Sequence, residues 1–332
     1  MDTERRFADA GQLADLVTAA FGTDRRIAES RRLPNGSKKG VYRLRLDDGT
    51  CVVVYIWDSV EDYWHGVLPD DAADPADPFS HASGLDLFEA ASVRLADLGV
   101  RSPALLLADR SRSRYPAEVA IVEDAGGTTL EELLGREPDA GAASLEVLAE
   151  SLGRMHAYGA PAFGKVGFVD AGGRSRAASC ERTVLDRALA EVDEVAGRDP
   201  RAEAGRGALT EMLHSLAARV VPRSRIGLIH GELGPDHVLV GPDGVPVLID
   251  IEGLMYFDIE WEHVFTRMRF ERHYDRLRRD DLDEDRMRLY QFAMHIDLVA
   301  GPLRIAESDH PQRQWFRDLA DFHLRQALDF RP

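Results

Sequence analysis

Two acidic segments on either side of a tight turn constrain this chain more than any other feature of its sequence. The first is residues 230–237 (HGELGPDH) and the second is residues 248–253 (LIDIEG). Short apolar runs of strand length border both segments, and Gly-Pro-Asp-Gly at 241–244 is typical of a turn. The pattern predicts strand, loop, strand, tight turn and strand over residues 226–250. Because a hairpin brings its strand ends together, we expect the two acidic segments to lie side by side.

These two segments carry five groups that can bind protons or metal ions: Glu232, Asp236, His237, Asp250 and Glu252. Like charges placed so close repel each other unless a cation lies between them. A divalent metal bound through carboxylate oxygens is the simplest such cation, and phosphate groups usually complete its ligand shell. Ordinary solvated acids on two surface loops are the alternative. The apolar strands, which aim both segments at one edge, favour a site.

The order of the predicted elements indicates an α+β fold. Apolar residues in alternation or in short runs predict strands at 41–46, 51–57, 105–107 and 119–122, and apolar residues at helical spacing predict helices at 1–22 and 84–98. After Gly126 and Gly127, helical periodicity dominates except in 226–250. Two loops separate the N-terminal elements: residues 32–40 are turn-rich and basic, and the acidic, proline-rich residues 66–82 are expected to form a mobile loop.

Composition excludes several classes of protein. With 332 residues, 44% of them hydrophobic, the chain can bury a large core in two domains or one two-lobed unit. Its net charge of −17 disfavours nucleic acid and anionic membranes as partners, and permits a cationic small molecule. We find no signal peptide and no apolar run long enough to span a membrane. Cys51 and Cys180 form neither a disulfide framework nor a zinc pair, so we expect a cytoplasmic protein.

With these parts in this order, the chain resembles the aminoglycoside phosphotransferase group of small-molecule kinases. That family has His-Gly-Asp and, further on, Asn in its catalytic loop, and Ile-Asp-Phe-Gly in its metal motif. Here His230-Gly231-Glu232 with His237, and Ile249-Asp250-Ile251-Glu252, take these places. Residues 88–103, 119–130 and 153–164 resemble the helix of the small lobe, the interlobe hinge and the helix that follows it.

The resemblance implies a bilobal protein-kinase-like fold, with a small β-rich N-lobe and a larger, mainly helical C-lobe. The expected divisions are a nucleotide-binding lobe at 1–122, a hinge at 123–127 and a catalytic and substrate-binding lobe at 128–332. Glu123 and Ala125 in the hinge would then contact adenine, and Ser37, Lys38 and Lys39 would contact the phosphates.

The resemblance also implies roles in catalysis. Glu232 would accept or orient the proton of the acceptor hydroxyl, with Asp236 as the other candidate. The metal ligands would be His237, Asp250 and Glu252. Further residues would be Glu89, which anchors the phosphate-contacting lysine; Asp258, which braces the catalytic loop; and Glu260 and Glu262, which contact a cationic substrate or else form a solvated, helix-capping face.

Three positions depart from the family pattern. Glu232 is one methylene longer than the expected Asp, and His237 replaces Asn, which suits Mn²⁺ or Zn²⁺ better than Mg²⁺. Tyr55 stands on the strand that should carry the lysine. Lys38 and Lys39 are then candidates to supply that charge from another direction, because the chain contains only one other lysine, Lys165. Two surface lysines on a turn are the alternative.

The sequence therefore favours an enzyme that uses ATP or GTP with Mg²⁺, or Mn²⁺, to phosphorylate a hydroxyl of a small molecule, such as an antibiotic or another secondary metabolite. We expect a monomer or homodimer. The main alternative is a pseudokinase that binds nucleotide or ligand without turnover. His230-Gly-Glu232 also matches the His-x-Glu of zinc deaminases, but the chain has no downstream Pro-Cys-x-x-Cys, and no P-loop motif is present.

Overall fold

The computed structural model of this chain describes residues 5–34, 36–68, 72–223 and 225–331. The chain divides into two compact units. The first comprises residues 1–65, 81–144 and 236–253, and the second comprises residues 66–80, 145–235 and 254–332. The metal-motif segment therefore belongs to the same unit as the N-terminal strands. The expected lobe boundaries at 122 and 128 stay a prediction.

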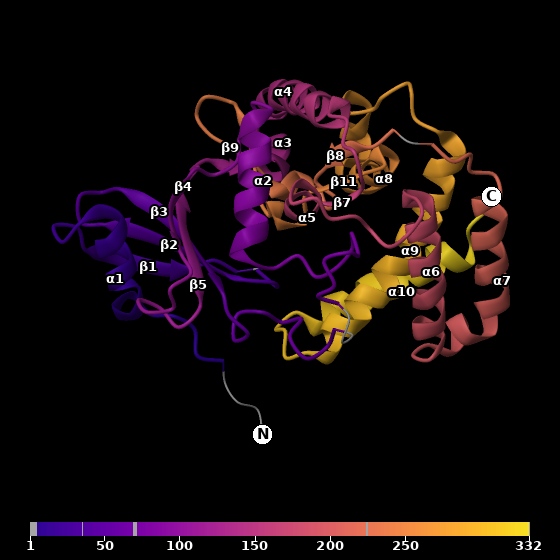
Figure 1. Cartoon of the computed structure of the whole chain (residues 1–332), viewed down its shortest axis with the longest axis horizontal. Coiled ribbons are helices and arrows are strands. Elements are labelled where there is room, and N and C mark those ends of the chain that lie inside the picture. The colour runs from indigo at the N-terminus through magenta and orange to yellow at the C-terminus, as the bar shows by residue number, and fades with distance from the viewer. Residues whose placement is uncertain (1–4, 35, 69–71, 224, 332) are drawn as a thin grey trace. The chain divides into compact units, whose positions relative to one another are not determined.

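A five-stranded antiparallel sheet forms the first unit's centre, in the order β1-β2-β3-β5-β4 (Figure 1). Its strands are β1 (Ile27–Arg32), β2 (Gly40–Leu46), β3 (Cys51–Trp57), β4 (Leu105–Asp109) and β5 (Glu118–Glu123). The strand β3 is apolar along its whole length because it pairs on both sides, with β2 and with β5. Four of the five strands agree with the prediction from periodicity.

Strand β1 lies in a region for which no strand was predicted. Its sequence, IAESRR, has no hydrophobic alternation, and its residues are intermediate or exposed. An edge strand needs one partner only, so its backbone pairing with β2 suffices without a buried face. Helix α1 (Ala10–Phe21) buries Leu13, Leu16 and Val17 in the core beside this sheet, as its stripe of apolar residues predicted.

A second, smaller sheet in the first unit holds the metal-motif segment. Its order is β10-β9-β6, from β10 (Pro246–Leu248), β9 (Val238–Val240) and β6 (Thr128–Thr129), which precedes α3 (Leu130–Arg136). The strands β9 and β10 pair antiparallel across the predicted 241–244 turn. Gly127 comes so close to β9 that an added Cβ would lie 1.9 Å from the carbonyl oxygen of Val240. Only glycine fits at that position, which also has a φ of +75°.

Helices make up most of the second unit (Figure 1). A core of buried apolar residues from α6, α7, α8 and α9 holds them together. A short sheet, β7-β11-β8, joins Gly164–Lys165, Met255–Phe257 and Gly227–Ile229. The helices are α4 (Pro138–Ala157, which begins in the first unit), α5 (Val166–Asp170), α6 (Cys180–Ala196), α7 (Pro200–Ala217), α8 (Ile259–Phe270), α9 (Glu284–Glu307) and α10 (Arg313–Leu328).

The acidic segment was expected to be a mobile loop, but its described residues between 66 and 80 belong to the second unit and are packed within it. The ammonium group of Lys165, whose side chain is buried, donates to the carbonyl oxygens of Pro78 and Ser80 at 2.8 and 2.7 Å. The ring of Phe79 packs 4.8 Å, centroid to centroid, from that of Trp261. The prediction of a mobile loop followed from the low overall hydrophobicity of the segment and did not take into account this one aromatic residue. Residues 69–71 of the segment lie outside the described residues.

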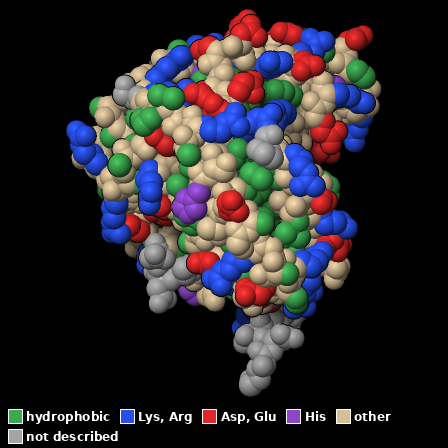
Figure 2. Space-filling model, turned by 90° about the vertical axis from the view of Figure 1, so that its right-hand side faces the viewer, with side chains coloured by type: hydrophobic (Ala, Val, Ile, Leu, Met, Phe, Trp, Pro, Cys, Tyr) green, Lys and Arg blue, Asp and Glu red, His purple; other side chains and the backbone are tan. Residues whose placement is uncertain are grey.

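The search for membrane-spanning helices found none among the described residues. On the face drawn in Figure 2, acidic side chains lie among basic ones. The net charge of −17 is therefore not gathered into one acidic patch on that face.

Candidate functional site

Four of the five predicted acid and histidine groups lie in the first unit, where they meet an unexpected partner. The ammonium nitrogen of Lys39 lies 2.7 Å from Oδ1 of Asp250 and 2.7 Å from Oε1 of Glu252. The Lys39 side chain is 8% exposed and that of Glu252 is 3% exposed. Lys39 comes directly before β2, and the two acids directly follow β10. We call Lys39, Asp250 and Glu252 the Lys39 cluster.

Asp250 has an unusual backbone as well as a charged partner. Its φ is +59°, in the left-handed region that Asp tolerates better than most residues. Burial alone would raise the pKa of Asp250, but the charges of Lys39, His237 and Lys38 lower it below its ordinary value. Burial alone would likewise lower the pKa of Lys39, and the charges of Asp250 and Glu252 reverse this and raise it. Both groups are therefore ionised near neutral pH.

His237 lies at the exposed edge of this cluster. Its Nε2 is 4.0 Å from Oδ2 of Asp250 and 4.0 Å from Oδ2 of Asp236. A backbone bond from Ile249 to the carbonyl of His237, at 3.0 Å, links the two acidic segments. This part of the expected convergence is present within one unit. Glu232 belongs to the other unit, so its expected closeness to Asp250 stays a prediction.

The fit of a metal ion can be tested on these distances. A divalent ion binds each donor at about 2.1 Å, so one ion can span His237 and Asp250. Glu252 fits less well, because Lys39 already neutralises it in a buried position. Among the described residues, no group of three or more His, Cys, Asp and Glu is arranged to hold a metal ion. A metal here would need nucleotide phosphates or water to complete its shell.

The basic loop before β2 is held in place by its neighbours. Tyr63 donates its backbone N–H to the carbonyl of Ser37 at 2.8 Å, and the indole of Trp64 donates to the Ser37 hydroxyl at 3.2 Å. Ser83 donates to the carbonyl of Lys38 at 2.9 Å. The aromatic pair Tyr63 and Trp64 therefore supports the loop. The predicted residues Ser37, Lys38 and Lys39 form one ordered segment.

The predicted hinge follows β5. Glu123 is occupied: its carboxylate accepts from Arg101 at 3.1 Å and from the backbone N–H of Ala104 at 3.2 Å. The backbone N–H and carbonyl of Ala125 form no hydrogen bond with other described residues. Ala125 is thus available to an adenine ring through its backbone, whereas the Glu123 side chain is not.

Glu89 does not anchor the lysine, contrary to the expectation. It lies on α2 (Leu85–Asp97), and its carboxylate pairs with Arg110, which also binds Asp86. No ion pair joins Glu89 to Lys39 within the described part of the chain. The reason is the change on β3: Tyr55 replaces the lysine that a carboxylate on α2 would meet, and its ring is buried against Phe88 of the same helix.

The catalytic-loop motif lies in the second unit, after β8. Gly231 and Leu233 are buried, and the Glu232 between them is exposed. The buried carboxylate of Glu262 accepts from the backbone N–H of His230 at 3.1 Å and lies 3.2 Å from Nε2 of His156. Glu262 therefore holds the base of the loop, and Glu232 projects from it.

The acids at the start of α8 have structural partners and are not open to a substrate. Glu260 and Glu262 are each 0% exposed, and Glu260 is paired with Arg223. Asp258 contacts the buried Arg286 at 2.5 Å instead of the catalytic loop. Glu260 and Glu262 are therefore not placed to contact a substrate. Asp258 is not placed to brace the catalytic loop. The brace is Glu262, one helical turn later.

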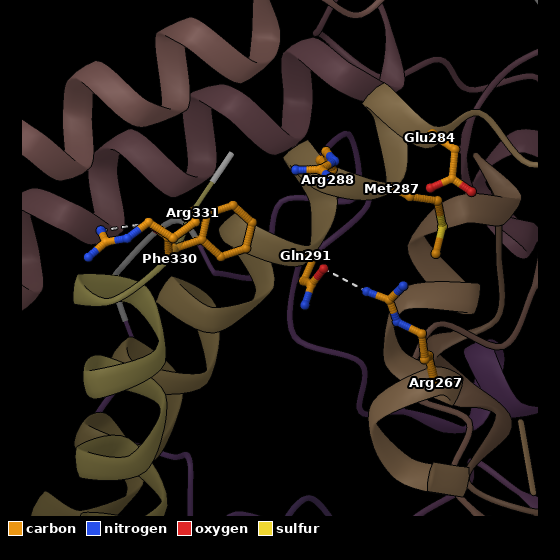
Figure 3. A pocket seen from close by; sticks show the side chains of 7 residues that line it. All are labelled: Arg267, Glu284, Met287, Arg288, Gln291, Phe330 and Arg331. Carbon is orange, nitrogen blue, oxygen red and sulfur yellow. Dashed lines mark hydrogen bonds between the residues drawn. The ribbon is translucent and has the colours of Figure 1, made fainter. Parts of the chain in front are cut away.

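A pocket of about 250 Å³ in the second unit contains none of the predicted site residues (Figure 3). It lies between α8, α9 and the C-terminal residues of the described chain. In it, Arg267 donates to Gln291 at 2.6 Å. The lining residues are Arg267, Glu284, Met287, Arg288, Gln291, Phe330 and Arg331.

Comparison with known proteins decides the family. The family model described as Phosphotransferase enzyme family matches residues 31–307, which is most of the chain. The chain belongs to the phosphotransferase enzyme family. This phosphotransferase gave no match in the comparison with curated proteins.

Solved structures share the fold of this phosphotransferase. A thermostable mutant of aminoglycoside phosphotransferase APH(4)-Ia, in a ternary complex with ADP and hygromycin B, has a TM-score of 0.61 at 17% identity, covering 95% of this chain and 98% of that chain. Spectinomycin phosphotransferase APH(9)-Ia with ADP and spectinomycin has a TM-score of 0.60 at 12% identity, with coverage of 96% and 95%. LicA in complex with AMP has a TM-score of 0.60 at 12% identity, covering 96% of this chain and 97% of that chain.

The predicted α+β, protein-kinase-like fold is therefore confirmed, with its antiparallel N-terminal sheet and helical C-terminal part. Family membership supports a phosphotransferase. Sequence reasoning missed the pairing of Lys39 with Glu252 and the bond from Glu262 to the catalytic loop. Neither pairing has a signal in periodicity or spacing, because each joins residues far apart in the chain.

Proposed function

We propose that this phosphotransferase is a nucleotide-dependent kinase that phosphorylates a hydroxyl of a small molecule. The single observation that carries the proposal is the Lys39 cluster beside His237. A buried ammonium, two carboxylates and an imidazole meet at the end of a hairpin in a chain of the phosphotransferase family. Phosphoryl transfer depends mainly on positioning and on neutralising phosphate charge, and these groups are suited to both.

In this proposal Asp250 and His237 hold the metal ion, which would neutralise the nucleotide phosphates when bound. The pair offers one carboxylate oxygen and one imidazole nitrogen 4.0 Å apart. The imidazole suits Mn²⁺ better than Mg²⁺, so activity with both ions should be compared. Ser37 and Lys38 are proposed to contact the phosphates, and the backbone of Ala125 the adenine or guanine ring of ATP or GTP.

Glu232 is the proposed base or orienting group for the acceptor hydroxyl. It is exposed, and its loop is held at a buried backbone bond from His230 to Glu262. Asp236, next to His237, is the second candidate. Because Glu232 is longer than Asp by one methylene, the acceptor oxygen would sit further from the loop backbone.

The proposed acceptor is a hydroxylated small molecule, and a cationic one would suit the net charge of −17. Two of the solved structures with this fold contain the antibiotics hygromycin B and spectinomycin. We propose a related class of acceptor here: an antibiotic or another secondary metabolite with several hydroxyl groups. Glu260 and Glu262 are not proposed as its contacts, because both are buried in ion pairs or hydrogen bonds.

A pseudokinase is the second candidate, and the replacement of the strand lysine by Tyr55 favours it. Such a protein would bind Mg·ATP or Mn·ATP without transferring the phosphoryl group. We prefer the enzyme, because the Lys39 cluster keeps a buried ammonium beside the acids.

The test is a mass-spectrometric screen of hydroxylated metabolites, with ATP or GTP and Mg²⁺ or Mn²⁺. The kinase is supported by the mass gain of one phosphoryl group on an acceptor, present with the wild type and lost with Glu232→Gln and Asp250→Asn. Nucleotide binding without any acceptor product would support the pseudokinase. A wild-type protein that binds no nucleotide would contradict both.

A further inference from the structure

The Lys39 cluster joins two segments that are far apart in the sequence. Lys39 precedes β2, while Asp250 and Glu252 follow β10. Taking a lysine and two carboxylates from water is costly unless each charge is compensated. Lys39 meets this condition with two contacts of 2.7 Å, and the cluster is too specific for a solvated surface lysine on a turn.

The number of donors on Lys39 shows what else it can bind. An ammonium group has three N–H donors and no acceptor. Asp250 accepts one of these donors at 2.7 Å, and Glu252 lies 2.7 Å from the same nitrogen as an ion-pair partner. A further anionic oxygen, such as that of a phosphate, can therefore approach the ammonium without displacing either acid. Such a ligand would approach on the side of Asp250, because the Asp250 side chain is 35% exposed and the Glu252 side chain is 3% exposed.

The neighbouring position on β3 is filled by an aromatic ring. The ring centroid of Tyr55 lies 5.1 Å from the ammonium nitrogen of Lys39. The two strands are paired here, with Val41 opposite Tyr55. A lysine at position 55 would therefore point toward the space that the Lys39 ammonium occupies. A lysine at either position 39 or position 55 would therefore place its ammonium group in the same region.

The carboxylate that holds this ammonium also has an unexpected origin. Glu89 on α2 is engaged with Arg110, so α2 contributes no carboxylate to Lys39. Glu252 takes that place, and neither of its oxygens forms a hydrogen bond with another described residue. The ion pair with Lys39 is its one charged contact within the described part of the chain.

We infer that Lys39 is the phosphate-positioning lysine of this enzyme, and that Glu252 is the residue that anchors it. This inference rests on the proposed nucleotide-dependent function. In it, Glu252 is a positioning residue and not a metal ligand. Lys39, just before β2, and Glu252, after β10, together position the phosphates. In the expected arrangement, a lysine on β3 and a glutamate on α2 would have this role.

A purely structural role for Lys39 makes a different prediction. If the ammonium only neutralised two buried acids, its removal would lower the midpoint of thermal unfolding and leave nucleotide affinity unchanged in the folded protein. If it contacts phosphate, removal weakens Mg·ATP binding. A hydrogen bond to a charged group contributes about 1.5–3 kcal/mol, which corresponds to roughly 10- to 100-fold in affinity.

The experiment measures Mg·ATP affinity by calorimetry, and the unfolding midpoint, for four proteins. They are the wild type, Lys39→Met, the control Arg45→Met, which removes an exposed cation of β2 that pairs with Glu29, and the exchange variant Lys39→Met/Tyr55→Lys. We expect Lys39→Met to bind Mg·ATP roughly 10- to 100-fold more weakly, Arg45→Met to bind like the wild type, and the exchange variant to regain most of the loss.

Equal affinity of folded Lys39→Met and wild type would overturn the inference, as would an exchange variant that folds but does not regain affinity. If Lys39→Met alone does not fold, the exchange variant still decides, because it keeps an ammonium beside Asp250 and Glu252. A wild type that binds no Mg·ATP refutes the proposed function itself. That outcome is distinct, because it appears before any variant is compared.

Discussion

Glu232 and Asp236 compete at the scale of single residues for the role of catalytic base. Glu232 is exposed at the tip of a loop anchored by Glu262, whereas Asp236 lies 4.0 Å from the imidazole of His237. If His237 binds the metal ion as proposed, a carboxylate next to its imidazole is better placed to orient that ligand than to accept a proton. This difference in surroundings favours Glu232.

We predict that Glu232→Gln lowers kcat by about 100-fold or more while KM for the nucleotide changes little, because an amide cannot accept the proton. Asp236→Asn should change the metal dependence more than kcat at saturating metal. Steady-state kinetics with an identified acceptor, over a series of Mn²⁺ concentrations, measures both effects. A larger loss of kcat for Asp236→Asn would assign the base to Asp236 instead.

The sequence predicted most of the residues that meet at the site and misplaced several of their roles. Residue type and spacing placed His237 and Asp250 together, because both lie near a turn between strands, whereas Lys39 was predicted only as a phosphate contact in a separate loop. The partners of Glu89 and Glu260 were wrong, since an arginine elsewhere in the chain neutralises each one. With many more arginines than lysines in the chain, no spacing rule tells which carboxylate such an arginine will meet.

At the scale of elements, the contact between α9 and α10 contains a buried histidine pair. Nδ1 of His295 lies 2.9 Å from Nδ1 of His323, and both side chains are buried. Burial lowers the pKa of His295 to about 4, with Arg267 contributing. Burial and the charge of His295 lower the pKa of His323 to about 4, against the opposing effect of Asp297. The pair is therefore neutral in the folded protein at neutral pH.

We predict that the free energy of unfolding falls as the pH drops from about 6.5 towards 4. The unfolded chain binds protons on these histidines in that window and the folded chain does not, so the loss should be about 2 kcal/mol for each histidine, or roughly 4 kcal/mol for the pair, by about pH 5. Urea unfolding at a series of pH values measures it. His323→Gln should weaken the dependence of the unfolding free energy on pH without removing it, because the pKa of the buried His263 is also lowered, to about 3. An unchanged slope would contradict this assignment.

Within the second unit, Lys165 holds the acidic segment in place. We predict that Lys165→Met lowers the free energy of unfolding by about 1–3 kcal/mol, because two carbonyl groups lose their donor. It should also expose the bonds near Phe79 to limited proteolysis. Arg45→Met is the control, because the exposed guanidinium of Arg45 pairs with Glu29 on the five-stranded sheet. A variant as stable and as resistant as the wild type would show that Phe79 alone suffices.

Elements that bury an apolar face were predicted well, and elements that do not were missed. The helices α1 and α2 and the strands β2, β3, β9 and β10 follow their hydrophobic pattern closely. The polar edge strand β1 and the two-residue strands β6 and β7 have too little apolar surface to show a period. The attachment of the acidic segment depends on one buried lysine and one phenylalanine. The overall composition of the segment predicted a mobile loop, because so few residues make these contacts.

At the scale of the whole molecule, ligand binding should stabilise the protein. We predict that Mg·ATP or Mn·ATP at about 100 times its Kd stabilises the native state by about 2.7 kcal/mol and raises Tm by several degrees. Differential scanning fluorimetry with ATP and GTP in parallel measures the shift and ranks the two nucleotides. EDTA should abolish the shift if the metal contributes to binding. A shift of equal size with EDTA would remove the metal from the proposal.

The family and fold could be predicted from the sequence at this scale because they depend on the order of many parts. The acceptor could not, because it depends on the shape of a surface that varies between proteins of one fold. The cytoplasmic location and the monomeric or dimeric state stay predictions. The net charge of −17 remains the strongest argument against binding to nucleic acid.

The burial of Lys39 and Lys165 has a practical consequence for chemistry on the folded protein. The sequence has three lysines, and Lys38 is the one whose side chain is not buried. An acylating reagent applied to the native enzyme should therefore modify one side-chain amine, at the rim of the proposed phosphate site. That amine is a single attachment point for a fluorophore or a surface linker, available without any change of the sequence.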